Sequence, residues 1–132
     1  MRAPLLLFAL GLLAGCSIFD PARGGPQACT MEFRTYTVRV VDAAGEPVEG
    51  LTTTVRNERT GEVLAFDDGS IFPENGTYLV ATDGHTFRRG GDPVSFHAEG
   101  DGLTASASFE FAFDGCHVVK ESGPEQIVAV PE

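Results

Sequence analysis

Residues 103–113 read Leu-Thr-Ala-Ser-Ala-Ser-Phe-Glu-Phe-Ala-Phe, and this stretch decides the fold. Every odd position from Leu103 to Phe113 is apolar, whereas the even positions carry mainly hydroxyl and carboxylate side chains. Successive side chains of a β-strand point to opposite faces, so the alternation predicts a long strand with one buried face. The three phenylalanines on that face are expected to supply much of the core.

Shorter stretches with the same alternation lie on both sides of this strand. They cover residues 35–40, 51–56, 77–81, 94–99, 116–119 and 126–130, with a further apolar run at 63–66. Turns rich in glycine, proline and aspartate separate them, including Asn75-Gly76, a dipeptide typical of tight turns. The sequence therefore predicts an all-β fold, an antiparallel Greek-key β-sandwich of about seven strands.

The chain begins with a leader of the secretory type. A positive residue is followed by an apolar run over residues 5–14, which is too short to cross a bilayer as a helix. The sequence Leu-Ala-Gly-Cys at 13–16 resembles the lipobox of bacterial lipoproteins. The resemblance implies a signal peptide over residues 1–15, cleavage between Gly15 and Cys16, and a lipid on Cys16.

Residues 16–28 would join this lipid to the folded domain. They contain prolines and paired glycines and few side chains that could pack, so we expect a flexible tether. Acyl chains on one residue anchor a protein stably when two or more are present. We therefore expect a chain anchored to the cell membrane or the outer membrane, facing the periplasm or the exterior, with its domain at residues 29–132.

Two further cysteines, Cys29 and Cys116, remain once Cys16 is assigned to the lipid. An exported domain folds in an oxidising compartment, so a disulfide between them is the default expectation. The alternatives are two free thiols or two metal ligands, although neither cysteine lies in a Cys-x-x-Cys pair. A bridge would close a loop of most of the domain and contribute about 4 kcal/mol to stability.

The chain is acidic, with a net charge of −10. Removal of residues 1–15 would take away one cation, Arg2, and no acidic residue, which changes the net charge to −11. Nucleic-acid binding requires clusters of lysine and arginine that neutralise phosphates, so we expect no nucleic-acid partner. The adjacent basic pair Arg88-Arg89 lies beside two glycines and is expected at a loop tip.

A resemblance to a known family lies between residues 36 and 85. The matching pieces are Val38–Asp42 with Gly45–Leu51, Asp67–Phe72 and Gly76–Val80, in that order. They resemble the opening strand, the G-x-P-V-x-G-A turn, the D-x-G-x-F segment and the G-x-Y-x-V strand of carboxypeptidase regulatory-like domains, although Leu51 replaces the alanine. The resemblance implies a prealbumin-like β-sandwich that serves as a noncatalytic accessory module. Residues 87–132 depart from the family pattern.

The residues that could carry chemistry form no catalytic or metal-binding motif. His85, His97 and His117 lack the spacing of a local metal site and are expected at the surface. Related transthyretin-like hydrolases end in Tyr-Arg-Gly-Ser, whereas this chain ends in Val-Ala-Val-Pro-Glu. We therefore expect no catalytic residue, no cofactor and no enzymatic activity.

Several aspartates lie in expected turns and leave one alternative open. Asp67, Asp68, Asp83 and Asp92 could bind calcium, but the spacing of a calcium loop is absent and turn capping explains them. The sequence thus favours a noncatalytic membrane-anchored lipoprotein with a structural or protein-interaction role at the cell envelope, bound to an envelope protein. The alternative is a small-ligand or calcium-binding module that uses the Asp-rich loops, with Asp67, Asp68 and Asp83 as metal candidates.

Overall fold

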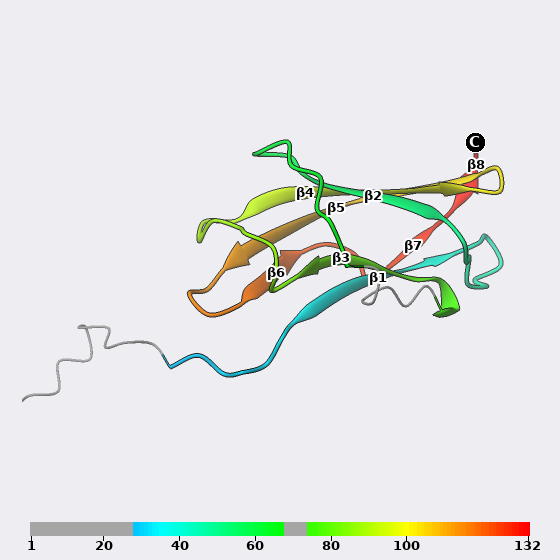
Figure 1. Cartoon of the computed structure of the whole chain (residues 1–132). Helices are drawn as coiled ribbons and strands as arrows, with labels where there is room; N and C mark the ends of the chain where they lie inside the picture. Colours follow the sequence, from blue (N-terminus) through cyan, green and yellow to red (C-terminus); the bar gives the residue numbers. More distant parts are fainter. Residues whose placement is uncertain (1–27, 68–73) are drawn as a thin grey trace, which may run out of the picture.

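The computed structural model describes residues 28–67 and 74–132, and in these it is all-β. Two sheets form two layers (Figure 1). The smaller sheet has the order β3 (Thr77–Thr82), β1 (Thr35–Val41) and β7 (Gln126–Val128). The larger sheet has the order β2 (Thr52–Asn57), β4 (Asp92–Gly100), β5 (Leu103–Phe113) and β6 (Val118–Ser122), with β8 (Val130–Pro131) also paired to β5. The predicted β-sandwich is confirmed.

The long strand predicted first, β5, is central to the larger sheet. It pairs with β4 from Leu103 to Phe111 and with β6 and β8 on its other side. Phe109 and Phe111 are buried while Glu110 between them is exposed, as the alternation predicted. Phe111 packs against Phe87 and Tyr36, with ring centroids 5.5 and 5.3 Å apart. These rings fill the core between the two sheets.

One strand pair departs from the antiparallel prediction. β7 runs parallel to β1, with Arg39 opposite Gln126 and Val41 opposite Val128, whereas the other described pairings are antiparallel. After β6 the chain crosses to the smaller sheet and enters beside β1 in the same direction. The buried Ala129 then donates its N–H to the Val41 carbonyl, and the chain continues as β8 on the larger sheet. The C-terminal segment therefore links the two sheets, which alternation alone does not indicate.

Two turn regions differ in detail from the elements expected from the sequence. The apolar run at 63–66 forms only an isolated bridge from Val63 to Arg56, although Leu64 is buried. Asn75 and Gly76 both have positive φ, 61° and 69°, within the short 3-10 turn η2 (Glu74–Gly76) that leads into β3. A Cβ on Gly76 would lie 2.6 Å from the Val40 carbonyl oxygen, so this close approach requires glycine.

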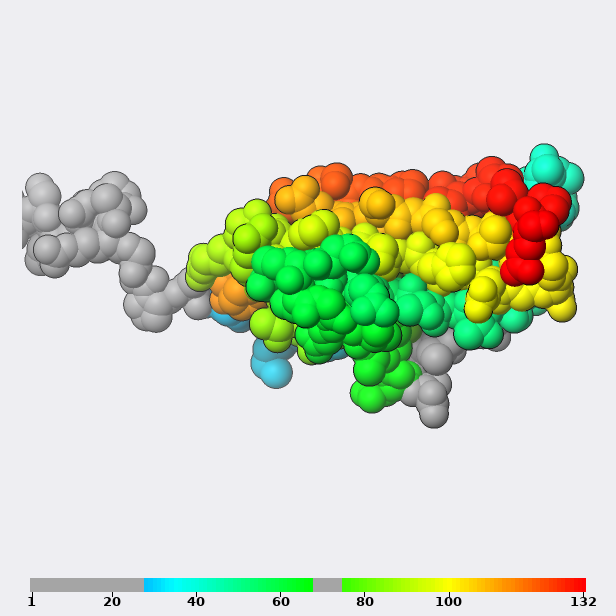
Figure 2. Space-filling model, turned by 90° about the horizontal axis from the view of Figure 1, so that it is seen from above, coloured from blue at the N-terminus to red at the C-terminus, as the bar shows by residue number. Residues whose placement is uncertain are grey.

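The described chain begins and ends at opposite ends of the sandwich (Figures 1 and 2). The expected signal peptide at 1–15, the cleavage and lipidation site at Gly15 and Cys16, nearly all of the tether at 16–28, and Asp68 lie outside the described residues. Among the residues that are described, no helix has both the length and the apolar character needed to cross a membrane.

Candidate functional site

Residues 29–34, here called the N-terminal strap, precede β1 and are fastened to the β5–β6 turn. A disulfide joins Cys29 to Cys116, with the Cα atoms 5.2 Å apart. This confirms the expected pairing of the two cysteines. The bridge spans 87 positions in sequence, so it fixes the start of the domain to its last third.

Three further contacts hold the strap in place. Thr30 Oγ1 lies 3.0 Å from His117 Nε2, and the Arg34 N–H donates to Asp83 Oδ2 at 2.8 Å. The Arg34 guanidinium also lies 3.8 Å from the Asp114 carboxylate. The strap forms no strand, so these side-chain contacts take the place of a regular hydrogen-bond ladder.

Asp83 and His117 form the polar centre beneath the strap. His117 Nδ1 donates to Asp83 Oδ2 at 2.7 Å, and the Val118 N–H donates to Asp83 Oδ1 at 2.7 Å. Burial would raise the pKa of Asp83, but the hydrogen bonds from Arg34, Val118 and His117 outweigh it and hold that pKa below its ordinary range. The arrangement is a closed structural network, because each carboxylate oxygen already accepts at least one hydrogen bond.

The surface position predicted for His117 is wrong. His117 is only 6% exposed, whereas His97 is exposed and His85 is half-buried. The ring of His117 is enclosed because Thr30 of the strap contacts Nε2 and Asp83 of the turn after β3 accepts from Nδ1. A segment without a regular period gives no sequence signal of this contact.

Both ring nitrogens of His85 are also engaged. The Thr82 N–H lies 3.0 Å from Nδ1, so Nδ1 is the acceptor and the proton resides on Nε2. Nε2 donates to the Ala65 carbonyl at 2.8 Å, which ties the turn after β3 to the segment after Val63. His85 could act as a base or a metal ligand only by breaking one of these bonds.

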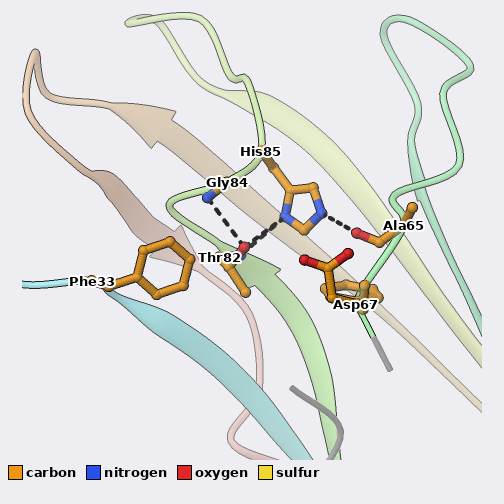
Figure 3. A pocket seen from close by; sticks show the side chains of 7 residues that line it. Phe33, Ala65, Asp67, Thr82, Gly84 and His85 are labelled. Atoms are coloured by element: carbon orange, nitrogen blue, oxygen red, sulfur yellow. Dashed lines mark hydrogen bonds between the residues drawn. The ribbon is translucent and has the colours of Figure 1, made fainter. Parts of the chain in front are cut away.

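A hollow of about 350 Å³ lies beside His85. It is lined by Phe33 of the strap, by Ala65, Phe66 and Asp67, by Thr82 at the end of β3, and by Gly84 and His85 of the turn after it. Figure 3 shows the carboxylate of Asp67 pointing toward the space between His85 and Phe33. The ring of Phe66 meets His85 edge-on, with centroids 5.0 Å apart and an interplanar angle of 77°. The hollow therefore combines aromatic walls with one carboxylate.

A second polar cluster lies at the start of β4. Asp92 is completely buried and accepts hydrogen bonds from Arg59 Nε, from Arg59 Nη2 at 2.9 Å and from Asn57 Nδ2 at 3.2 Å. Arg88 Nε lies 2.9 Å from the same carboxylate. The Arg59 guanidinium holds the pKa of Asp92 at about 2, below its ordinary 3.8, although burial acts in the opposite direction. The cluster joins the loop after β2 to the β3–β4 loop, and protein donors occupy both carboxylate oxygens.

The aspartates considered for calcium do not converge. Asp83 is saturated by protein donors, Asp67 lines the hollow, and Asp68 lies outside the described residues. Within residues 28–67 and 74–132, no three histidine, cysteine, aspartate or glutamate side chains are grouped so that they could hold a metal ion.

Comparisons with protein-family models, with curated proteins and with solved structures give no match to this chain. The segments that resemble carboxypeptidase regulatory-like domains fall on β1, on the turn after it and on β3, and Asp67–Phe72 lies almost wholly outside the described residues. The resemblance therefore stays a prediction.

No pattern in the sequence indicated the hollow. Phe33 lies in an irregular segment, and Ala65, Phe66 and Asp67 follow a run expected to be a strand. The walls come from the strap, from the segment after Val63 and from the turn after β3. No spacing in the sequence relates these three segments. The pairing of β1 with β3 brings the strap beside the turn after β3, and the hydrogen bond from His85 to Ala65 adds the third segment.

Proposed function

We propose that this chain is a lipid-anchored, noncatalytic β-sandwich module that serves a structural or protein-interaction role at a bacterial cell envelope. It would be attached through Cys16 to the cell membrane or the outer membrane and would face the periplasm or the exterior. The carboxypeptidase regulatory-like character of residues 36–85 belongs to the same proposal, because that family supplies accessory modules rather than catalytic ones.

The Cys29–Cys116 disulfide is the observation that carries the proposal. Disulfides persist in exported proteins and are rare in reducing compartments, so the bridge supports export of the domain. It lies at the point where the expected tether enters the domain. The lipobox resemblance at residues 13–16 then supplies both the route of export and the anchor.

The hydrogen bonds that the polar side chains form within the protein support a noncatalytic role. A general base needs an accessible lone pair, and a nucleophile needs such a base beside it. The ring nitrogens of His85 and His117 and the carboxylates of Asp83 and Asp92 already bond to protein groups. The groups best suited to acid–base chemistry thus fasten loops together.

Intact mass spectrometry of the protein purified from its own membrane tests the anchor. We expect loss of residues 1–15, added mass from acyl chains on Cys16, and two thiols that become alkylated only after reduction. A mass without acyl chains, or a chain that begins elsewhere, would contradict the anchor. A hydrolytic activity lost on substitution of His85 would contradict the noncatalytic role.

A further inference from the structure

We propose that the hollow beside His85 binds an organic ammonium group, such as that of a primary alkylamine or a lysine side chain. The hollow combines three properties that suit such a group: aromatic walls, an exposed carboxylate and unused acceptor oxygens. The inference goes beyond the anchoring role proposed above and does not depend on it, since it rests on described residues of the folded domain alone.

The aromatic walls come from two separate segments. Phe33 is 65% exposed although it is a large apolar residue, and it lies on the strap that the disulfide fastens. Phe66 is half-buried and packs edge-on against His85, so its position is fixed by the turn after β3. The face of a phenylalanine ring attracts a cation electrostatically, and contact with the ring removes an alkyl chain from water.

The lining of the hollow carries a negative charge. Asp67 is exposed, lines the hollow and forms no hydrogen bond or ion pair with another described residue. Among the described lining residues there is neither a lysine nor an arginine. The chain as a whole carries a net charge of −10, which raises the local concentration of cations and lowers that of anions. Electrostatics thus favour a cationic ligand over a carboxylate or a phosphate.

The hydrogen-bonding groups of the hollow also favour a cationic ligand. The N–H groups of Thr82 and Gly84 and the Nε2–H of His85 are donated to groups within the site. No described side chain that lines the hollow brings a free N–H donor, and the acceptors that remain are the Asp67 carboxylate and the second lone pair of the Ala65 carbonyl. A primary ammonium group has three donors and no acceptor, so it complements this lining.

The volume of the hollow limits the size of the ligand that it can bind. At about 350 Å³ it lies at the small end of ligand-binding pockets. A short alkyl chain ending in an ammonium group fits such a volume. The affinity should be modest, with a Kd on the order of millimolar, because the carboxylate and Phe33 are both exposed to water.

The test is a ligand titration of the full mature chain, labelled with ¹⁵N and held in neutral detergent. Binding is measured from the changes in the amide chemical shifts. The probes are n-butylammonium, its neutral analogue butan-1-ol, and N-acetyl-lysine methylamide. We expect n-butylammonium to give saturable shifts at Thr82, Gly84 and His85, and butan-1-ol to bind at least about 5-fold more weakly. Saturation by the lysine derivative as well would identify a protein side chain as the source of the ammonium group, and saturation by n-butylammonium alone would identify a free amine.

Three variants sharpen the result. Asp67→Asn should weaken n-butylammonium binding about 5-fold, and Phe33→Leu, which keeps an apolar side chain without the ring, about 3-fold. Asp101→Asn is the matched control, because Asp101 is an exposed turn residue whose φ of 54° asparagine tolerates. Equal binding of n-butylammonium and butan-1-ol, an unchanged Kd in Asp67→Asn, or shifts that grow linearly over the whole acidic surface would each overturn the proposal. The same spectra report folding directly, and if Asp67→Asn fails to fold, Asp67→Ser removes the same charge and carries the same expectation.

Discussion

Replacement of Asp92 by asparagine should lower the stability of the domain in a way that depends on pH. The carboxylate is fully buried and is contacted by Arg59, Arg88 and Asn57. Its pKa of about 2, compared with an ordinary 3.8, corresponds to about 2.5 kcal/mol of stability at pH 7. Asparagine at this position would keep the shape of the side chain and remove its charge, so most of this contribution should be lost.

The sign of the pH dependence follows from the direction of the shift. Because the pKa of Asp92 is lower in the folded state, its contribution is complete above about pH 4 and is lost as the pH falls through 2. The same linkage relation gives about 1.3 kcal/mol at pH 3 and about 0.4 kcal/mol at pH 2. Asp83 and Asp114 also have lowered pKa values, but they titrate in both proteins and cancel in the difference.

Urea denaturation followed by far-ultraviolet circular dichroism measures the effect, since the chain has no tryptophan. We expect Asp92→Asn to be less stable than the parent by about 2 to 3 kcal/mol at pH 7 and by less than about 1 kcal/mol at pH 2. Asp101→Asn, in an exposed turn, should match the parent at both pH values. An equal loss at pH 7 and pH 2 would refute the reasoning, because it would place the cost in packing and not in charge.

Three other predictions concern stability. A Cβ at position 123 would lie 2.1 Å from Phe109 Cδ1, whereas position 45 has nothing within 4 Å; both glycines have positive φ. Gly123→Ala should therefore cost at least about 1 kcal/mol more than Gly45→Ala in urea denaturation. Reduction of the disulfide should lower stability by about 4 to 5 kcal/mol, seen as a fall in Tm with reductant, because the unfolded chain regains its entropy. His117→Ala should cost about 2 to 3 kcal/mol because it removes one of the two donors to Oδ2 of Asp83 and leaves a cavity beside that carboxylate, whereas the exposed His97→Ala should change stability by less than about 0.5 kcal/mol.

The elements that the sequence predicted well are those with a strict period or a small number of possible partners. The alternation over residues 103–113 identified β5 and its buried face because one sheet face must be apolar. Cys29 and Cys116 could be paired because the lipobox resemblance removed the third cysteine. In both cases a local pattern or a count is sufficient, and no long-range information is required.

The polar networks could not be predicted in the same way. Asp92 precedes Pro93 and follows two glycines, which is the composition of an exposed turn. It is buried because Arg59 arrives from a loop 33 residues earlier in the chain. The parallel entry of β7 beside β1 depends similarly on where the chain crosses between sheets. Contacts between loops that are distant in sequence leave no periodic pattern, so they can be identified only from the folded structure.

The strap connects the stability of the domain to the proposed ligand site. Its start is held covalently at Cys29, and its end is held by the hydrogen bond from Arg34 to Asp83, so Phe33 lies between two fixed points. Without these fixed points, an exposed aromatic ring on an irregular segment would contribute less to ligand affinity, because binding would have to order the segment at a cost in entropy. The disulfide and the buried Asp83–His117 pair remove that cost in advance. A histidine and an aspartate whose side chains could serve catalysis are therefore better explained as the support that holds Phe33 opposite His85.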